Sequence, residues 1–240
     1  MSAKTPAKTR YTASRRIKWG IYHLARYLVR AVTHFAIHYR IYGQENVPRI
    51  GPVLIVANHL HNYDLIALDA AIPRPVFYMA KRELFEKWLP SFIIRNVGAF
   101  PINREGIDRT AIRHAGVLLN EGLVVGILPE GTRSPTHTLQ QGHPGAAMVA
   151  QNNDVPIVPV GITGTENLPF DTKRTGERWW FRPVTVTIGK PFYLPKRRPG
   201  EKPDHYAATE RIMLEIAALL PPEYRGFYAE RLEASKAAKE

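Results

Sequence analysis

His59 and Asp64 form the first pair of side chains in this sequence that could carry out acid–base chemistry. His59 comes directly after a short apolar stretch, residues 53–57, which is typical of a buried strand. Asp64 stands where a helical pattern begins. Because α/β proteins tend to place their sites at the carboxyl ends of strands, we expect His59 on such a loop. A hydrogen bond from the imidazole to Asp64 would fix its tautomer, and the other ring nitrogen would act as a general base.

The pair lacks an obvious enzyme nucleophile that it could activate. The chain contains no cysteine and no G-x-S-x-G elbow. The natural proton donor is therefore a hydroxyl group of the substrate. His61 leaves two alternatives open, because it could replace His59 as the base or join the pair as a zinc ligand. We expect no metal, since no H-E-x-x-H pattern is present.

A second polar block, Leu-Pro-Glu-Gly-Thr-Arg-Ser at residues 128–134, closes another apolar stretch, residues 124–128. It is therefore expected at the carboxyl end of another strand. Gly131 permits a tight turn or the close approach of a ligand to the backbone. Arg133 offers a planar fork of donors that suits phosphate or carboxylate. The alternative interpretation is a surface turn with a Glu–Arg pair of little energetic value.

Four blocks in this order resemble the glycerolipid acyltransferases of the 1-acylglycerol-3-phosphate acyltransferase type, the PlsC family. The resemblance covers roughly residues 42–192. The blocks are Asn58-His59 with Asp64, Gly-Ala-Phe-Pro-Ile-Asn-Arg at 98–104, Pro-Glu-Gly-Thr-Arg-Ser at 129–134, and Val-Pro-Ile-Val-Pro-Val at 155–160. Each block alone is suggestive, and four in order are highly specific.

The resemblance implies a role for each block. His59 would take the proton of an acceptor hydroxyl as it attacks a thioester carbonyl, and Asp64 would orient His59. Glu130 would accept hydrogen bonds from the acceptor or position Arg133. Backbone donors near Gly131 are candidates for stabilising the oxyanion. The residues implied in holding the acceptor and its phosphate are Lys81, Arg104, Glu130, Gly131, Thr132 and Arg133. Two prolines of the fourth block would contact the acyl donor or form the wall of the site, Pro156 and Pro159.

The implied reaction moves a fatty acyl group from acyl-CoA or acyl-carrier protein to the free hydroxyl of a lysophospholipid. The expected acceptor is 1-acyl-sn-glycerol-3-phosphate, which gives phosphatidic acid. The acyl donor is a substrate, so no cofactor is expected. Two departures from the family pattern keep glycerol-3-phosphate and a non-phosphate lysolipid open as acceptors. They are His61, where many members have serine, and Leu128, where phenylalanine is more usual.

Strand and helix patterns alternate through the part of the chain that carries the blocks. Strands are predicted at residues 53–57, 76–80, 99–103, 124–128, 156–162 and 184–188. Helices are predicted at 64–71, 84–96 and 146–152, with a loop at 163–183. A further helix is predicted from a cap at Asp108 to about Asn120, with Gly122 in the C-terminal stop position. This alternation indicates an α/β fold, and the resemblance makes it a central mixed sheet covered by helices.

The first 40 residues have a different character. Residues 1–13 are predicted to be a disordered basic tail, and residues 14–40 an amphipathic helix that associates with a membrane. One face of that helix is apolar: Ile17, Ile21, Leu24, Leu28, Val32 and Phe35. Packing of this face on the domain core is the alternative. No stretch is apolar and long enough to span a membrane. We expect residues 41–200 to form the acyltransferase domain and residues 201–240 a helical segment.

The net charge of +12 predicts attraction to polyanions. Nucleic acid is not an expected partner, because no recognised nucleic-acid module is present. An anionic membrane surface is expected instead, with the protein peripheral on the cytoplasmic side of the cell membrane. The alternative class is a non-catalytic basic protein that binds membranes or nucleic acid. The presence of both His59 and Asp64 argues against it.

Overall fold

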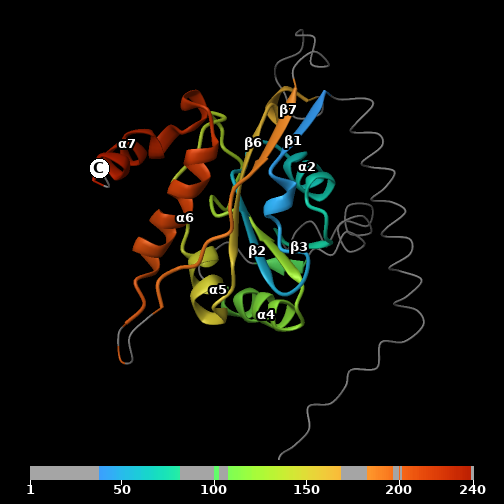
Figure 1. The fold of residues 1–240 in the computed structure, drawn as a ribbon, viewed down its shortest axis with the longest axis vertical. Helices are drawn as coiled ribbons and strands as arrows, with labels where there is room; N and C mark the ends of the chain where they lie inside the picture. Colours follow the sequence, from blue (N-terminus) through green and yellow to red (C-terminus); the bar gives the residue numbers. More distant parts are fainter. Residues whose placement is uncertain are drawn as a thin grey trace, which may run out of the picture.

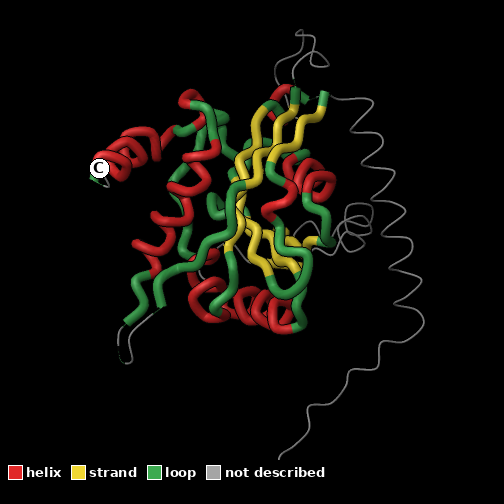
Figure 2. Tube along the Cα trace, viewed as in Figure 1, coloured by secondary structure: helices red, strands yellow, loops and turns green. Residues whose placement is uncertain are grey.

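The computed structural model describes residues 38–81, 100–102, 108–168, 183–196, 200 and 202–238. Seven strands form one sheet in the order β1-β7-β6-β2-β5-β3-β4 (Figures 1 and 2). The strands are β1 (Tyr39–Tyr42), β2 (Val53–Ala57), β3 (Val76–Lys81), β4 (Phe100–Ile102), β5 (Val124–Ile127), β6 (Ile157–Thr163) and β7 (Val184–Ile188). The six strands predicted from the sequence are all present, with bounds that differ by at most a residue or two.

Five of the strands, β6, β2, β5, β3 and β4, run parallel to one another. β7 pairs antiparallel with β6 and parallel with β1, so the sheet is mixed, as expected. The carboxyl ends of the five parallel strands lie at one edge, where α/β proteins usually carry their sites. Both polar blocks lie at this edge, because Asn58 follows β2 and Leu128 follows β5.

Helices cover both faces of the sheet (Figures 1 and 2). α2 (Asp64–Ala71) packs on one face, whereas α4 (Arg109–Asn120), α5 (Gly145–Asn153) and α6 (His205–Leu219) pack on the other. α7 (Ala229–Ala237) contacts α6. Short 3₁₀ helices are η1 (Gln44–Asn46), η3 (Thr165–Asn167), η5 (Pro222–Tyr224) and η6 (Gly226–Tyr228). The fold is therefore a layer of helices on each side of a mixed sheet.

β2 forms the centre of the sheet because five consecutive apolar residues can be buried from both sides. Leu54 and Val56 pack against the α4–α6 layer, whereas Val53 and Ile55 pack against the α2 layer. Every residue of β2 is at most 1% exposed. A strand buried on both faces lacks the alternation of polar and apolar residues, and the continuous apolar stretch in the sequence reflects this.

α4 has the start and stop signals that the sequence predicts. The carboxylate of Asp108 accepts hydrogen bonds from the backbone N–H groups of Thr110 (2.9 Å) and Ala111 (3.0 Å). It thereby satisfies two of the amide groups that have no partner in the first turn of a helix. Gly122 follows the helix with φ of 77°, a left-handed conformation that favours glycine.

β1 is the strand that the sequence pattern does not predict. It contains Tyr39 and Arg40, the last two residues of the range assigned to the amphipathic helix. Its four residues alternate between half-buried and exposed at the edge of the sheet. So short an edge strand gives too few residues for a period to be recognised. The rest of the predicted amphipathic helix and the tail at 1–13 lie outside the described residues, as do the predicted helix at 84–96 and residues 169–182.

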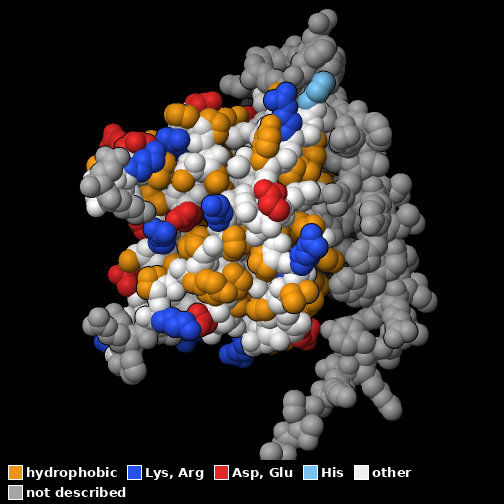
Figure 3. Space-filling model, in the orientation of Figure 1, with side chains coloured by type: hydrophobic (Ala, Val, Ile, Leu, Met, Phe, Trp, Pro, Cys, Tyr) orange, Lys and Arg blue, Asp and Glu red, His pale blue; other side chains and the backbone are white. Residues whose placement is uncertain are grey.

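The surface of the described part mixes charges of both signs. On the face shown in Figure 3, Lys and Arg side chains are spread among Asp and Glu side chains and do not form one basic patch. None of the helices in the described ranges combines the length and the apolar character that crossing a membrane requires.

Candidate active site

His59 and Asp64 meet at the carboxyl edge of the sheet. The Nδ1 atom of His59 lies 2.8 Å from Oδ2 of Asp64. A carboxylate can only accept, so Nδ1 carries the proton and Nε2 is left with the lone pair of a general base. The histidine side chain is 13% exposed, whereas that of Asp64 is completely buried. The predicted pair is therefore in hydrogen-bond contact, and His59 is accessible to solvent.

Asp64 is the first residue of α2, and its carboxylate turns back toward the preceding loop as expected. Oδ2 also accepts the backbone N–H groups of Leu60 (2.6 Å) and His61 (2.8 Å). The other oxygen, Oδ1, accepts a hydrogen bond from the hydroxyl of Thr165 at 2.5 Å. Asp64 thus fixes the loop as well as the imidazole.

Asn58 ties this loop to β6. Ala57 and Val160 form the last Cα pair between β2 and β6. Beyond that pair, the side chain of Asn58 donates to the carbonyl of Ile162 (2.9 Å) and accepts from its N–H (2.7 Å). The amide group therefore takes the place of a further strand residue. It sets the position at which the chain leaves β2 and becomes His59.

Glu130 has a structural role that the sequence did not predict, in addition to the role that the family resemblance implied. It is 1% exposed. Its Oε1 accepts the backbone N–H of His59 at 2.7 Å, and its Oε2 accepts the backbone (2.9 Å) and side-chain (3.3 Å) N–H groups of Gln140. Both oxygens of this buried carboxylate therefore accept hydrogen bonds from the protein itself. Glu130 thereby holds the backbone of His59, and its contact with an acceptor stays a prediction.

The environment of Glu130 changes its acidity. Burial raises the pKa of Glu130 to about 7, although the hydrogen bonds from Gln140 and His59 lower it. Desolvation penalises the charged form, and here it outweighs the three hydrogen bonds that favour that form. The Glu130 carboxyl group, which accepts the backbone N–H of His59, therefore titrates near neutral pH.

The rest of the Pro-Glu-Gly-Thr-Arg-Ser loop also contacts the dyad. The backbone N–H of Ser134 donates to the carbonyl of His59 at 2.8 Å. Gly131 has φ of 67° and makes the predicted tight turn, with its N–H bonded to the carbonyl of Leu128. Thr132 and Arg133 are exposed. This places the Arg133 guanidinium at the surface of the loop that holds His59, where a ligand can reach it.

His61 is poorly suited to replace His59 as the base. It is 3% exposed, and its ring stacks on that of Tyr63 with 5.2 Å between centroids. Burial lowers the pKa of His61, and Arg133 adds to this effect, whereas Asp64 and Glu166 oppose it. Within the described ranges, no group of three His, Cys, Asp or Glu residues is arranged to hold a metal ion.

The other predicted residues lie at different places in the fold. Lys81 is the last residue of β3, so its backbone lies at the same edge as the dyad. Arg104 lies outside the described residues. Pro156 precedes β6 at the opposite, amino edge, where its carbonyl accepts the N–H of Leu54. Pro159 is inside the sheet, paired with Val56. The position of Pro156 corrects the expectation that it forms a wall at the dyad. The role of Pro159 and contact of either proline with the acyl donor stay predictions.

Thr165, Gln140 and Ser134 are site residues to which the sequence pattern gives no role. Thr165 contacts Asp64 from 101 positions away, and Gln140 reaches Glu130 from ten. No spacing rule links such positions, because the contacts depend on how β6 and the loop after β5 meet. Ser134 lies inside the second polar block, but its contribution comes from its backbone, which its residue type does not reveal.

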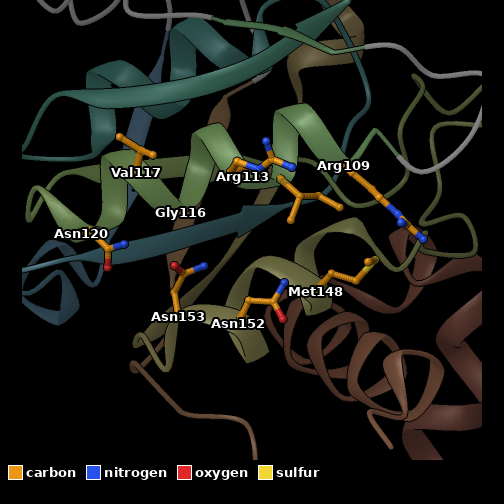
Figure 4. A pocket seen from close by; sticks show the side chains of 9 residues that line it. Arg109, Arg113, Gly116, Val117, Asn120, Met148, Asn152 and Asn153 are labelled. Carbon is orange, nitrogen blue, oxygen red and sulfur yellow. The ribbon is translucent and has the colours of Figure 1, made fainter.

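A groove of about 550 Å³ lies on the outer helical layer, apart from the dyad (Figure 4). It is lined only by residues of α4 and α5: Arg109, Ile112, Arg113, Gly116, Val117, Asn120, Met148, Asn152 and Asn153. Side chains from both helices line the gap between them in Figure 4. None of the residues predicted for the site lines this groove.

Comparison with known proteins identifies the family to which the chain is similar. The family model described as acyltransferase matches residues 38–163. The chain is 37% identical over 127 residues to the 1-acyl-sn-glycerol-3-phosphate acyltransferase of Bacillus subtilis, which covers 52% of this chain and 62% of that protein. It is 30% identical over 166 residues to 1-acyl-sn-glycerol-3-phosphate acyltransferase beta of Homo sapiens, which covers 68% and 58%, respectively.

A solved structure has the same fold. The 1-acyl-sn-glycerophosphate acyltransferase PlsC of Thermotoga maritima superposes with a TM-score of 0.64 at 21% identity, over 88% of this chain and 83% of that one. The family model spans more than half of this chain, which therefore belongs to the acyltransferase family. The resemblance to its PlsC-type members is confirmed. The chain spans about half to three fifths of the length of the curated relatives that it matches.

Proposed function

We propose that this protein is an O-acyltransferase that moves a fatty acyl group from acyl-CoA or acyl-carrier protein to the free hydroxyl of 1-acyl-sn-glycerol-3-phosphate. The observation that carries the proposal is the His59–Asp64 hydrogen bond of 2.8 Å, on a loop whose backbone is clamped by Glu130 and Ser134. The acceptor is chosen because the relatives from Bacillus subtilis and Homo sapiens are named as acyltransferases for it.

The dyad supports direct transfer in one attack. Nε2 of His59 takes the proton from the acceptor hydroxyl as its oxygen bonds to the thioester carbonyl carbon. The resulting tetrahedral intermediate collapses by breaking the carbon–sulfur bond. The leaving thiolate receives the proton from His59, which returns to its neutral form. Throughout, Asp64 stabilises the positive charge that develops on the imidazole.

A covalent acyl-enzyme is not part of this proposal. The chain has no cysteine. In the described residues, the side-chain hydrogen bond of the His59 ring is to Asp64, and no serine or threonine hydroxyl is bonded to it. The acceptor hydroxyl takes the place that a serine hydroxyl has in a triad. No group beyond the two substrates is needed for the proton and the acyl group to balance.

The acceptor's phosphate is assigned to Arg133, with Lys81 and Arg104 as further candidates from the family pattern. Arg133 is exposed on the loop that clamps His59, and its guanidinium suits bidentate contact with phosphate. The loop that carries Arg133 is thus hydrogen-bonded to the backbone of His59, the proposed base. This arrangement favours an acceptor with phosphate close to its free hydroxyl.

Purified protein incubated with a panel of acceptors and donors, followed by mass spectrometry of the lipids, tests the proposed function. The panel comprises 1-acyl-sn-glycerol-3-phosphate, glycerol-3-phosphate and a lysolipid without phosphate, each with acyl-CoA and with acyl-carrier protein. Diacyl product from the first acceptor, formed faster than from the other two, supports the proposal. Transfer to none of the three would refute it, and preference for one of the others would correct the acceptor.

Membrane association at the cytoplasmic side is part of the same proposal. The acceptor and its diacyl product both reside in bilayers. Residues 1–37 carry eight basic and no acidic side chains, together with the apolar face predicted for residues 14–40. This combination is typical of segments that bind anionic lipid surfaces without spanning them.

A further inference from the structure

Thr165 lies against the side of Asp64 that faces away from His59. Its hydroxyl donates to Oδ1 of Asp64 at 2.5 Å. The relative exposure of both residues is 0%, so water does not compete for the bond. Thr165 belongs to none of the four blocks and follows the region, residues 38–163, that the family model matches.

The end of β6 delivers Thr165 to this place. The two hydrogen bonds between Asn58 and Ile162 hold β6 beside the point at which the dyad loop begins. Gly164 then turns the chain with φ of 88°. A Cβ at this position would collide with the carbonyl oxygen of Pro183, so the turn needs glycine. The turn directs Thr165 toward the first residue of α2, which is Asp64.

The Thr165 bond completes the restraint on the carboxylate. Oδ2 of Asp64 accepts from Nδ1 of His59 and from two backbone N–H groups, of Leu60 and His61. Oδ1 on the other side accepts from Thr165. Because both oxygens are held, the carboxylate plane cannot rotate, and Oδ2 stays directed at the imidazole. Without the hydroxyl, a buried oxygen would lose a charge-assisted hydrogen bond, which is costly in a buried site.

We propose that Thr165 is a positioning residue for acyl transfer, which acts by holding Asp64 in the orientation that keeps the proton of His59 on Nδ1. This inference rests on the proposed function, in which Nε2 of His59 is the base. Thr165 does not touch the substrates. Its loss should therefore reduce kcat and leave the KM values of donor and acceptor nearly unchanged.

Thr165→Val and Thr165→Ser separate the hydroxyl from the shape of the side chain. Thr165→Val, which lacks the hydroxyl, should lower kcat by about tenfold or more, on the scale of one lost charge-assisted hydrogen bond. Thr165→Ser keeps the donor and should retain most of the activity. Thr163→Val is the matched control, because Thr163 is half-buried two residues earlier in β6 and makes no hydrogen bond to Asp64. Equal kcat values for the Val and Ser variants would overturn the proposal.

A double substitution shows whether Thr165 acts through Asp64. In an Asp64→Asn background, adding Thr165→Val should change kcat by less than about twofold, since the carboxylate that Thr165 positions is gone. A second tenfold loss, independent of the first, would contradict the proposed route.

Nuclear magnetic resonance of ¹⁵N-labelled histidine tests the inference without any turnover. The wild-type ring of His59, assigned with a His59→Gln variant, should carry its proton on Nδ1. In Thr165→Val the Nδ1–H form should fall in population or exchange faster, whereas Thr163→Val should leave it unchanged. An unaltered His59 signal in folded Thr165→Val would overturn the inference. If the wild type transfers no acyl group at all, the proposed function fails, and this measurement still decides the role of Thr165.

Discussion

His59 is held by segments that lie far apart in the sequence. Its ring is fixed by Asp64, its N–H by Glu130 and its carbonyl by Ser134. Both polar groups of its backbone and one ring nitrogen are therefore occupied. In the proposed reaction, Nε2 of His59 is therefore preorganised as the base, and little freedom has to be lost when the acceptor hydroxyl binds.

Glu130→Gln should change how stability depends on pH. Burial raises the pKa of Glu130 to about 7 from 4.5. The native state therefore holds this proton more tightly than the unfolded state, and the stability linked to it is fully present below about pH 4.5 and is lost as pH rises to 7. A shift of this size corresponds to about 3 kcal/mol. Glutamine does not titrate, so the variant should gain stability relative to wild type as pH rises.

Urea unfolding of both proteins at about pH 5 and about pH 8 measures this difference. The free energy of unfolding of Glu130→Gln minus that of wild type should be larger at about pH 8 than at about pH 5. Other carboxylates titrate equally in both proteins and cancel in the comparison. A difference that does not change with pH would mean that Glu130 has an ordinary acidity in the folded protein.

Among the elements, those with strong local signals were predicted well. The bounds of β2 and α2 coincide with the prediction, because β2 is continuously apolar and α2 lies between an aspartate and Pro73. The cap of α4 by Asp108 and its left-handed stop at Gly122 were also predicted correctly. The meeting of both polar blocks at one edge follows from the parallel order of the strands.

What the sequence did not reveal depends on contacts between distant segments. β1 is an edge strand whose pairing with β7 leaves no local period. The direction of the Glu130 carboxylate, toward the backbone N–H of His59, is set by how the loop after β5 packs. Pro156 lies at the opposite edge of the sheet. The sequence did not reveal this position, because a matching block does not indicate which end of its strand faces the site. Three-dimensional packing decides each of these features.

The loop that carries Glu130 is itself supported by the segment between α6 and α7. Leu139 donates to the carbonyl of Tyr224 (2.8 Å) and accepts from the N–H of Phe227 (2.9 Å). The hydroxyl of Tyr228 accepts the N–H of Gly142 at 3.1 Å. Gly226 allows this close approach, because a Cβ there would lie 2.5 Å from the carbonyl oxygen of Leu139.

Gly226→Ala should therefore reduce both stability and kcat. The residue has φ of 44°, so alanine adds backbone strain as well as the collision with Leu139. Gly51→Ala is the matched control, since Gly51 has φ of 81° and a Cβ added there would have no neighbouring atom within 4 Å. The control should lose about 1 kcal/mol from strain alone and keep its activity. Urea unfolding and steady-state kinetics provide the two readouts, and equal behaviour of the variants would argue against support of the loop by this segment.

The hydrophobic core includes residues from the part of the chain that follows the region matched by the family model, residues 38–163. Ile212, Met213 and Ile216 of α6 are buried in the same cluster as the residues of β2 and β5. The hydroxyl of Tyr224 donates to Glu166, next to Thr165, at 2.7 Å. The part of the chain after residue 163 therefore helps to build the site and is not an appendage to it.

Removal of residues 1–37 should separate membrane binding from chemistry. The cut leaves β1 complete and preserves His38, whose carbonyl accepts the N–H of Val184 at 3.0 Å. The full chain should cosediment with anionic vesicles, and this binding should weaken in high salt without disappearing, because each Lys or Arg near the surface contributes about 1 kcal/mol that salt screens. The shortened chain should bind much less and lose activity on bilayer substrate.

A short-chain, soluble acceptor is the control for the shortened chain, which should still acylate it if the core is folded. Far-ultraviolet circular dichroism confirms the folding. Vesicle binding by the folded, shortened chain equal to that of the full chain would mean that the membrane contact lies elsewhere. The helix predicted at residues 14–40 would then pack on the core.

The most direct test of the account compares His59→Ala and His61→Ala in the transfer of an acyl group to 1-acyl-sn-glycerol-3-phosphate. Product formed by each purified protein is measured by mass spectrometry under saturating donor and acceptor. If His59 is the general base, His59→Ala should lower kcat by about 10²-fold or more. Folded His61→Ala should keep most of the activity. The His61 ring is buried and that burial lowers its pKa, so His61 is not placed to take the proton of an acceptor. Transfer that survives the loss of His59 but vanishes with His61 would contradict the central claim.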